Sequence, residues 1–408
     1  MADKTKELKF KIVVNTTPAE AYVAFTNATA LTEWLCDTAK ADPRPGGRLY
    51  LGWNSDYYAS GEFLTLEPGE KVVFSWLGRD EPGATRARVT FKPEEGGGTR
   101  ITLTHSDFGS GKAWKPVIKG AEEGWVHGLE NLKSVLETGQ DLRVVRRPML
   151  GVVGVEDLCA EDAEKLNLPV KGGLRLQGIV DGTGAQAAGL QKGDIIVKIA
   201  GEKTLSVLDF VNVMQRRQAG DQVKVVYYRQ DSATGELQKQ NVMMELSQRP
   251  IPAIPLTAAE LAEVLKKTYA ECFAGLQAAL CNADKEQLNR RPAEGEWSAA
   301  EVMAHLIITE RETQTLIGGL LEDRAESFEY HANQPIRVVA TAATFHTARR
   351  LLAELKRLQL GTVALVAALP EEFVARKRSY WTMAYTLLTM PYHLEDHGSQ
   401  IRAVLEFP

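Results

Sequence analysis

The first 140 residues alternate between apolar and polar positions in short runs. The runs that repeat with a period of two are residues 8–14, 47–53, 60–66, 70–77, 85–92 and 99–105. This period predicts strands with one buried face and one face in water. Turn signals at 67–69 and at 94–98, which contains three consecutive glycines, separate several of the runs. We therefore expect a sheet in this part of the chain.

Two stretches of the same region have helical patterning. Residues 18–35 follow the first predicted strand, and residues 114–138 carry an apolar stripe at helical spacing. A strand, a short helical segment, a curved antiparallel sheet and a long final helix describe an α+β helix-grip fold. The region resembles the START-like (SRPBCC) superfamily, and within it the domain shared with activators of the Hsp90 ATPase. The resemblance covers residues 1–140 and is carried by the run from Thr17 to Trp34, GGRLYLGW at 46–53 and GWVHGLENLKSVLE at 124–137.

After a linker at 141–148, residues 149–247 follow a different pattern. MLGV at 149–152 precedes GAQAAGLQKGDIIVKIAGEK at 184–203, a predicted helix at 206–217 and an apolar strand at 221–229. The order of these motifs resembles a mainly-β PDZ domain of the bacterial type. Gly193 suits a tight turn with positive φ. We expect Ala187 and Ala188 to let a short helix lie close to the sheet.

A linker with three prolines at 248–255 leads into a region patterned as helix to its end. Amphipathic segments are predicted at 257–282, 298–321, 340–369 and 382–406. Four such segments joined by modest loops indicate an all-α four-helix bundle over residues 256–408. The predicted architecture is therefore multidomain, with the bundle following the helix-grip and PDZ domains.

Composition narrows the class of protein. The chain is 44% hydrophobic and 25% charged, with a formal net charge of -5 and no run of like charge, so we expect no nucleic-acid partner. No secretory signal and no apolar stretch long enough to span a membrane is found in the sequence. The cysteines Cys36, Cys159, Cys272 and Cys281 are scattered without a CxxC pair. Reduced thiols in the cytoplasm are the expected state.

Among seven histidines, His393 and His397 stand four apart on the last predicted helix. That spacing puts both imidazoles on one face, with Cβ atoms roughly 6 Å apart. His305 lies on the second predicted helix, which begins with Ser298 and Glu301 in capping-box spacing. We expect His305 deep in the bundle. A pair of histidines at this spacing is also consistent with a plain polar helix face, and this alternative stays open.

The histidines lie in motifs that resemble the DinB-like (YfiT-like) family of metal-binding helical bundles. The matching segments are W-S-x-x-E-V-x-x-H-L at 297–306 and H-x-x-x-H-x-x-Q-I at 393–401. The resemblance implies that His305, His393 and His397 are the ligands of a divalent metal. Asp396 departs from the family, which often has histidine there, and we expect that change to affect only the groups around the ligands.

Three neutral imidazoles leave coordination positions free, as in catalytic metal sites. Nitrogen ligands do not select sharply among zinc, nickel, iron and manganese, so the sequence leaves the ion open. A bound water would become more acidic and nucleophilic. Gln400 and Glu301 are predicted to orient a ligand or substrate. Pro391, just before His393, removes one helical hydrogen bond and favours a kink.

The PDZ resemblance implies a peptide-binding groove. Backbone amides of Met149, Leu150, Gly151 and Val152 are predicted to receive the carboxylate of a protein C-terminus. The predicted helix at 206–217 forms the other wall, with Leu208, Phe210 and Val211 contacting peptide side chains. The alternative is that another segment of the same chain fills this groove. A protease site is not expected, because the sequence has no HExxH motif and no room for a His-Asp-Ser set.

The helix-grip resemblance implies an apolar cavity between sheet and terminal helix. The aromatic residues predicted to approach it are Trp34, Trp53, Trp76, Phe91 and Trp125. Such a cavity can bind a small apolar ligand. Packing in the core explains the same residues without a ligand, and both interpretations are kept.

Two functions fit the sequence. The first is an enzyme, in which the bundle is a metal-dependent transferase or hydrolase acting on a small, thiol-containing molecule. The second is a stress- or chaperone-linked adaptor that binds an apolar ligand and peptide C-termini without catalysis. An open metal position facing a cavity with polar partners favours the enzyme, whereas a closed site with an accessible PDZ groove favours the adaptor.

Overall fold

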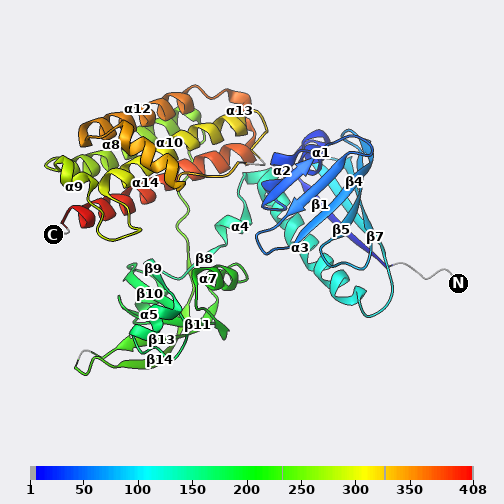
Figure 1. The fold of residues 1–408 in the computed structure, drawn as a ribbon. Coiled ribbons are helices and arrows are strands. Elements are labelled where there is room, and N and C mark those ends of the chain that lie inside the picture. Colours follow the sequence, from blue (N-terminus) through cyan, green and yellow to red (C-terminus); the bar gives the residue numbers. More distant parts are fainter. Residues whose placement is uncertain (1–5, 232, 326–327, 407–408) are drawn as a thin grey trace. The chain divides into compact units, whose positions relative to one another are not determined.

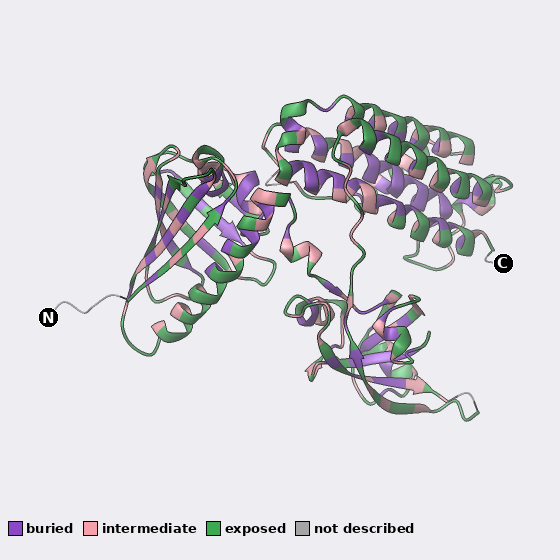
Figure 2. Ribbon diagram, turned by 180° about the vertical axis from the view of Figure 1, so that it is seen from behind, coloured by how far each residue is buried: buried purple, intermediate pink, exposed green. Residues whose placement is uncertain are grey.

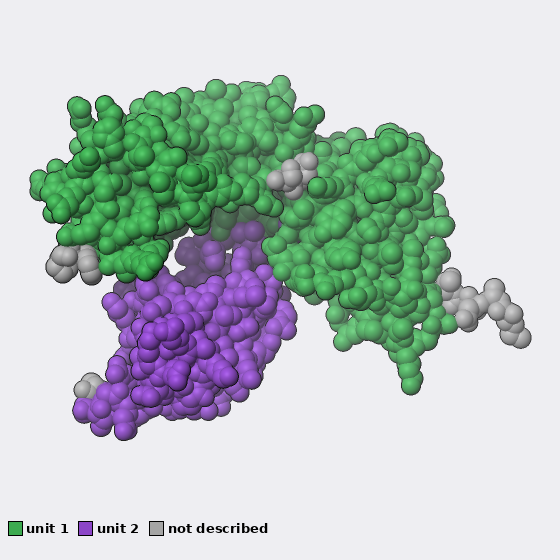
Figure 3. All heavy atoms as spheres, in the orientation of Figure 1, with its two compact units in different colours: residues 1–141, 252–408 green, residues 142–251 purple. Residues whose placement is uncertain are grey.

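The computed structural model describes residues 6–231, 233–325 and 328–406, and Figure 1 shows its helices and strands. Residues 1–5, 232, 326–327 and 407–408 lie outside this description, so the outer ends of the predicted ranges 1–140 and 256–408 fall there. The described chain forms two compact units (Figure 3). One unit joins residues 1–141 with 252–408, and the other contains residues 142–251.

The N-terminal sheet is antiparallel, and its described strands follow the order β1-β7-β6-β5-β4-β3-β2. The strands are β1 (Lys6–Val14), β2 (Thr38–Ala41), β3 (Arg48–Gly52), β4 (Tyr58–Glu67), β5 (Lys71–Gly78), β6 (Thr85–Pro93) and β7 (Thr99–Phe108). Each predicted run overlaps one of these strands. The prediction missed β2, because four residues are too few to show a period.

The sheet is accompanied by α1 (Pro18–Thr26), α2 (Ala28–Thr32) and α3 (Trp114–Thr138). The predicted helix at 114–138 is confirmed, and its stripe buries Leu129, Leu132 and Val135. The single helix predicted at 18–35 is wrong, since the backbone of Asn27 is extended. The Asn27 side chain accepts a hydrogen bond from the amide of Ala30 at 2.8 Å. It therefore caps a second helix rather than continuing the first.

The unit formed by residues 142–251 is rich in strands. Its larger described sheet has the order β14-β13-β11-β10-β9, with β12 paired to β11, and β15 pairs with β8. These elements are α4 (Leu142–Val145), β8 (Pro148–Met149), β9 (Val152–Leu158), α5 (Ala160–Lys165), β10 (Gly173–Ile179), α6 (Gly184–Ala187), β11 (Ile195–Ile199), β12 (Glu202–Lys203), α7 (Val207–Met214), β13 (Gln222–Gln230), β14 (Leu237–Glu245) and β15 (Ser247–Gln248). The strand β9 lies at one edge of the sheet.

Two predictions concern the segment before β11: a tight turn at Gly193, and a close approach of α6 to the sheet at Ala187 and Ala188. Gly193 has φ +92°, which an L side chain rarely adopts. Ala188 is half-buried and packs against the core, whereas Ala187 is exposed and does not bring α6 close to the sheet. Ala185 is fully buried there, and a Cβ on Gly184 would lie 1.8 Å from the carbonyl oxygen of Glu245 in β14. The close approach therefore depends on Gly184 and Ala185.

The C-terminal region consists of helices, and Figure 2 shows its buried residues on their inner sides. The long described helices are α8 (Ala258–Leu280), α10 (Ala299–Leu321), α12 (Ala348–Ala367) and α14 (Lys377–Glu406), and the short ones are α9 (Lys285–Asn289), α11 (Pro335–Thr344) and α13 (Glu371–Ala375). The helix predicted at 340–369 is divided. Phe345 ends α11, and the Thr347 hydroxyl caps α12 by accepting from the amide of Arg350.

Within the larger unit, the N-terminal region contacts the helical region through a buried carboxylate. Glu33, at the end of α2, accepts a hydrogen bond from Arg378 at 3.0 Å and another from Ser379 at 2.9 Å. Lys377 donates to the carbonyl oxygen of Glu137, and Thr29 accepts from the amide of Ala325. Burial raises the pKa of Glu33, and the charge of Arg378 opposes this shift. These contacts join the first part of the chain to the bundle.

Candidate metal centre

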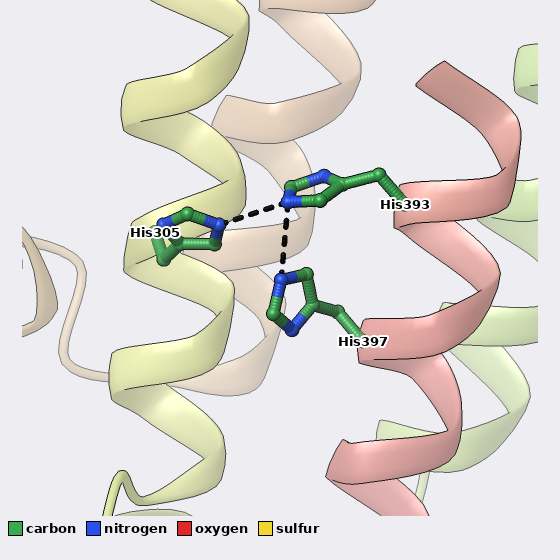
Figure 4. A group of neighbouring side chains, drawn as sticks. All are labelled: His305, His393 and His397. Atoms are coloured by element: carbon green, nitrogen blue, oxygen red, sulfur yellow. Dashed lines mark hydrogen bonds between the residues drawn. The ribbon is translucent and has the colours of Figure 1, made fainter. Parts of the chain in front are cut away.

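Two long helices bring the predicted histidines together. The capping box predicted at the start of α10 is present, since Ser298 accepts from the amide of Glu301 and Glu301 accepts from the amide of Ser298. His305 lies two turns into α10 and is buried, as expected. His393 and His397 lie one turn apart on α14, and their rings point toward His305 (Figure 4).

The three rings converge through the same type of nitrogen. The Nε2 atom of His393 lies 3.0 Å from Nε2 of His305 and 3.1 Å from Nε2 of His397 (Figure 4). One nitrogen from each ring lies within 4.8 Å of the others. Nitrogens bound tetrahedrally to zinc at ordinary bond lengths lie about 3.3 Å apart. The two separations from His393 are therefore close to those of nitrogens that share an ion.

Hydrogen bonds on the far sides of two rings fix which nitrogens face inward as acceptors. The Nδ1 atom of His305 lies 3.3 Å from the carbonyl oxygen of Ala332, and Nδ1 of His397 lies 2.7 Å from Oε1 of Gln400. Because these oxygens only accept, Nδ1 is the nitrogen that carries a proton towards them in each ring, and the single-proton tautomer leaves Nε2 with a lone pair. A single Nε2 proton on His393 cannot serve both neighbours well. A cation among the rings removes this conflict.

The surroundings of His305 and His393 favour the neutral form that metal binding needs. Burial, reinforced by the neighbouring imidazole of His397, lowers the pKa of His305. Burial also lowers the pKa of His393 to about 4, with His397 and His305 contributing. Neutral imidazoles offer their lone pairs to a metal without first losing a proton. The Nδ1 atom of His393 is buried without a protein partner, so packing holds that ring.

A cavity of about 310 Å³ adjoins the histidines. Besides His305 and His393, it is lined by Thr309, Tyr330, Ala332, Asn333, Thr386, Thr389 and Met390. Hydroxyl, amide and phenol groups thus stand beside the ring nitrogens, next to the apolar Met390. This volume is at the lower end of the range for pockets that bind small molecules. The histidine cluster can therefore face a small molecule as well as water.

The two residues predicted to support the ligands, Gln400 and Glu301, differ in what they contact. Gln400 lies beside His397 and accepts its Nδ1 hydrogen bond, as expected. Glu301 was predicted to orient a ligand or substrate, and its carboxylate oxygens are engaged by other partners. It binds the Arg291 guanidinium and the amide of Ser298. Its function is to cap α10 and pair with Arg291, which occupies both oxygens.

Several residues beside the cluster were missed. The carbonyl of Ala332 that holds His305 has no signal in the sequence, because any residue offers a carbonyl. Thr309 follows His305 by four positions, and Thr389 precedes His393 by four. Helical spacing puts each threonine on the same face as its histidine, so this signal was available. Tyr330 and Asn333 lie in the connection before α11 and depend on how that segment folds.

The predicted peptide groove maps onto an edge strand and α7. Met149 and Leu150 precede β9, and Leu150 is buried in the core, which leaves its backbone rather than its side chain for a peptide. Gly151 has φ +87°, and its carbonyl accepts from the amide of Val180. Val152 begins β9. On α7, Leu208 is 70% exposed and Val211 is half-buried, and peptide binding by these residues stays a prediction.

The aromatic residues predicted to line an apolar cavity pack against one another in the N-terminal core. Trp34, Trp76, Phe91 and Trp125 are buried, and Trp53 packs against them. The ring centroids of Trp76 and Trp125 are 5.6 Å apart, and those of Trp53 and Trp76 are 6.1 Å apart. This packing agrees with the core interpretation. The apolar ligand remains a prediction.

A buried histidine lies beside these aromatic rings. Trp125 donates from Nε1 to Nδ1 of His105 at 2.9 Å, and Nε2 of His105 lies 2.7 Å from the Thr85 hydroxyl. Thr85 in turn donates to the carbonyl of Trp76. Burial lowers the pKa of His105 to about 4. The ring is therefore neutral and fully hydrogen-bonded, which makes it a structural group.

Models of known families match successive parts of the chain. The Activator of Hsp90 ATPase homolog 1-like protein family matches residues 15–137, the PDZ domain 149–241 and the DinB superfamily 268–401. The chain combines these three domain families. The resemblances found in the sequence are thereby confirmed, as is the multidomain fold class. The three-histidine cluster lies on helices of the DinB-like domain.

Individual relatives cover smaller parts of the chain. Two curated relatives named serine protease Do-like HtrA, from Lactococcus lactis subsp. lactis and subsp. cremoris, are each 35% identical over 89 residues. That match covers 21% of this chain, which spans about a fifth (22%) of the length of each relative.

Solved structures similar to this chain match part of it. The Aha1 dimer from Colwellia psychrerythraea is 19% identical, covers 32% of this chain and 96% of its own, and has a TM-score of 0.29. An Hsp90 activator from Plasmodium falciparum is 24% identical, covers 32% of this chain and 95% of its own, and has a TM-score of 0.28.

Two further features concern membrane-spanning helices and the cysteines. No helix in the described part of the chain is long and apolar enough to cross a membrane. In the described part of the chain, no disulfide involves Cys36, Cys159, Cys272 or Cys281, in line with their scattered positions.

Proposed function

We propose that His305, His393 and His397 of the DinB-like domain hold one divalent metal ion and that the adjoining cavity binds its substrate. The observation that carries this proposal is the convergence of three Nε2 atoms while Ala332 and Gln400 accept the Nδ1 protons of two rings. Hydrogen bonds of this kind fix the tautomer and direction of metal-binding histidines. Zinc, nickel, iron and manganese all fit such a set of nitrogen donors.

The proposed activity is that of a metal-dependent transferase or hydrolase acting on a small, thiol-containing molecule. A divalent ion supplies Lewis acidity, which lowers the pKa of a water or thiol at neutral pH. The protein supplies the rest. Tyr330 and Asn333 offer hydrogen bonds that orient a polar substrate, and Met390 offers an apolar contact. The threonine hydroxyls donate to carbonyls of their own helices and can accept a hydrogen bond from the substrate. The free thiols of the chain support the predicted cytoplasmic location.

Cobalt substitution tests whether the cavity delivers a small thiol to the histidines. The full chain is loaded with one equivalent of Co²⁺, and its visible spectrum is recorded before and after adding 2-mercaptoethanol. We expect the spectrum to change with a saturable dependence on the thiol. A Thr389→Val variant, which removes a hydroxyl from the cavity, should alter this dependence, whereas His346→Ala should not. A cobalt spectrum insensitive to the thiol would exclude it as a substrate class.

The adaptor function is kept as a second candidate because of the PDZ domain. Its edge strand β9 has no strand partner on its outer side among the described residues, and Val153 on it is 60% exposed. A free edge and an exposed Leu208 support binding of a peptide as an added strand. Titration with peptides ending in a free or an amidated C-terminus tests this. Equal binding of both would contradict recognition of the carboxylate.

A further inference from the structure

A second cavity of the bundle, of about 330 Å³, lies between α8 and α12. It shares no lining residue with the cavity beside the histidines. Its lining comprises Lys266, Tyr269, Ala270, Phe273, Ala274, Gln277, Lys356, Gln359, Leu360 and Val363. No acidic residue is among them. The lining therefore combines apolar side chains with two exposed lysines, Lys266 and Lys356.

The side chain of Gln359 is the unusual group of this cavity. Gln359 is only 3% exposed, and its Nε2 atom is buried with no hydrogen-bond partner among the described residues. Leaving a buried donor unpaired costs about 1–3 kcal/mol, so native structures rarely retain one without a reason. An acceptor atom in the cavity would remove this cost. Gln359 thus points to a ligand that carries an acceptor.

Tyr269 does not compete for that role, because its hydroxyl is already used. It donates to the carboxyl group of Glu310, which is buried in the bundle and also accepts from Thr362. Burial raises the pKa of Glu310. Tyr269 therefore closes the inner end of the cavity and leaves Gln359 and the lysines to meet a ligand.

The charge of the lining indicates the sign of the ligand. Lys356 lies over the ring of Phe273, 5.4 Å from its centroid, and has no ion-pair partner in the described chain. Lys266 has only the exposed Glu263, at 3.5 Å. Two ammonium groups and an unpaired amide donor favour an anion, and a carboxylate can accept from both kinds of donor. Phe273, Leu360 and Val363 favour an apolar body attached to it.

We propose that this cavity is a binding site for a small carboxylate with an aromatic or aliphatic tail. The carboxylate accepts hydrogen bonds from Gln359 and Lys356, and the tail packs on Phe273, Leu360 and Val363. The site is separate from the histidine cluster and stands whether or not that cluster binds a metal.

Calorimetric titration of the full chain with 4-phenylbutyrate tests this site, with 4-phenylbutylamine as a probe of the same shape and opposite charge. We expect saturable binding of the carboxylate only. Lys356→Gln should weaken it about tenfold, the usual effect of losing a charged hydrogen bond. Gln359→Met, which keeps the side-chain length, should weaken it as well. Lys267→Gln, an exposed neighbour of Lys266 that does not line the cavity, should bind as the wild type does.

Three results would overturn the proposal. They are no saturable binding of 4-phenylbutyrate, equal binding of the amine, and unchanged affinity in Lys356→Gln. Lys356 is exposed, so its variant tests the site even if Gln359→Met fails to fold.

Discussion

At the scale of single residues, the direction of each imidazole distinguishes a metal site from a polar helix face. Helical spacing places His393 and His397 side by side but does not determine which nitrogen faces inward. The acceptors Gln400 and Ala332 decide this, because each takes an Nδ1 proton and leaves Nε2 as a lone pair. Gln400 could be identified from its spacing, whereas Ala332 could not.

Removal of the Gln400 acceptor should weaken metal binding. Gln400→Leu leaves the Nδ1 proton of His397 without its partner, and changes of this kind reduce affinity by about 10–100-fold. Gln400→Glu keeps an acceptor oxygen and should restore affinity. Competition with a chelating dye measures this. Ser399→Ala, next to Gln400 but bonded elsewhere, should bind normally. Equal affinity in Gln400→Leu would show that Gln400 does not support the ligand.

His105 should make stability depend on pH. Its ordinary pKa is 6.5 and its folded pKa is about 4, so the folded state holds the ring neutral while the unfolded chain takes up a proton. Its stabilising effect is complete above pH 6.5 and is lost as the pH falls towards 4. The difference corresponds to about 3 kcal/mol. The free energies of unfolding of wild type and His105→Gln, measured with denaturant, should therefore converge by that amount between pH 7 and pH 4. A constant difference would contradict this.

At the scale of elements, patterning predicted the long helices and strands well and their interruptions poorly. The period of two located strands β3 to β7, and apolar stripes located α3, α8 and α10. The breaks at Asn27 and Thr347 were missed, because a capping side chain ends a helix without disturbing its apolar stripe. The contact of α6 was assigned to Ala187 and Ala188, of which only Ala188 packs against the core, because spacing alone does not say which small residues face the sheet.

The corrected contact of α6 leads to a stability prediction. Gly184→Ala places a Cβ 1.8 Å from the carbonyl oxygen of Glu245, which forces a backbone shift. Such overpacking typically costs about 1–3 kcal/mol. Ala187→Ser, at the exposed position, should be nearly neutral. Hydrogen exchange in the full chain measures how readily residues 142–251 unfold in each variant. A larger effect of Ala187→Ser would restore the original assignment.

At the scale of the whole molecule, the association of the first region with the bundle was absent from the sequence prediction. It depends on contacts of Glu33 with Arg378 and Ser379, which lie 345 and 346 positions further along the chain. Nothing in local patterning links such residues, whereas motif order was enough to predict the three domain families. The domain boundaries at 1–140, 149–247 and 256–408 remain predictions.

Loss of Arg378 should weaken this association. Arg378→Ala leaves Glu33 buried without its cation, and removal of one partner of a buried pair typically costs about 3–5 kcal/mol. We expect a lower melting temperature for the unit formed by residues 1–141 and 252–408. Arg402→Ala, an exposed arginine of the same helix, serves as the control. Identical calorimetric traces for wild type and Arg378→Ala would mean that the pair does not hold these regions together.

The metal content of the purified chain tests the central claim most directly. Elemental analysis should find about one divalent ion per chain in the wild type, since one cluster of three histidines can hold one ion. His393→Ala combined with His397→Ala should abolish it, while the exposed His346→Ala should retain it. Equal metal content in wild type and the double variant, or none in either after incubation with zinc, nickel, iron and manganese, would contradict the account.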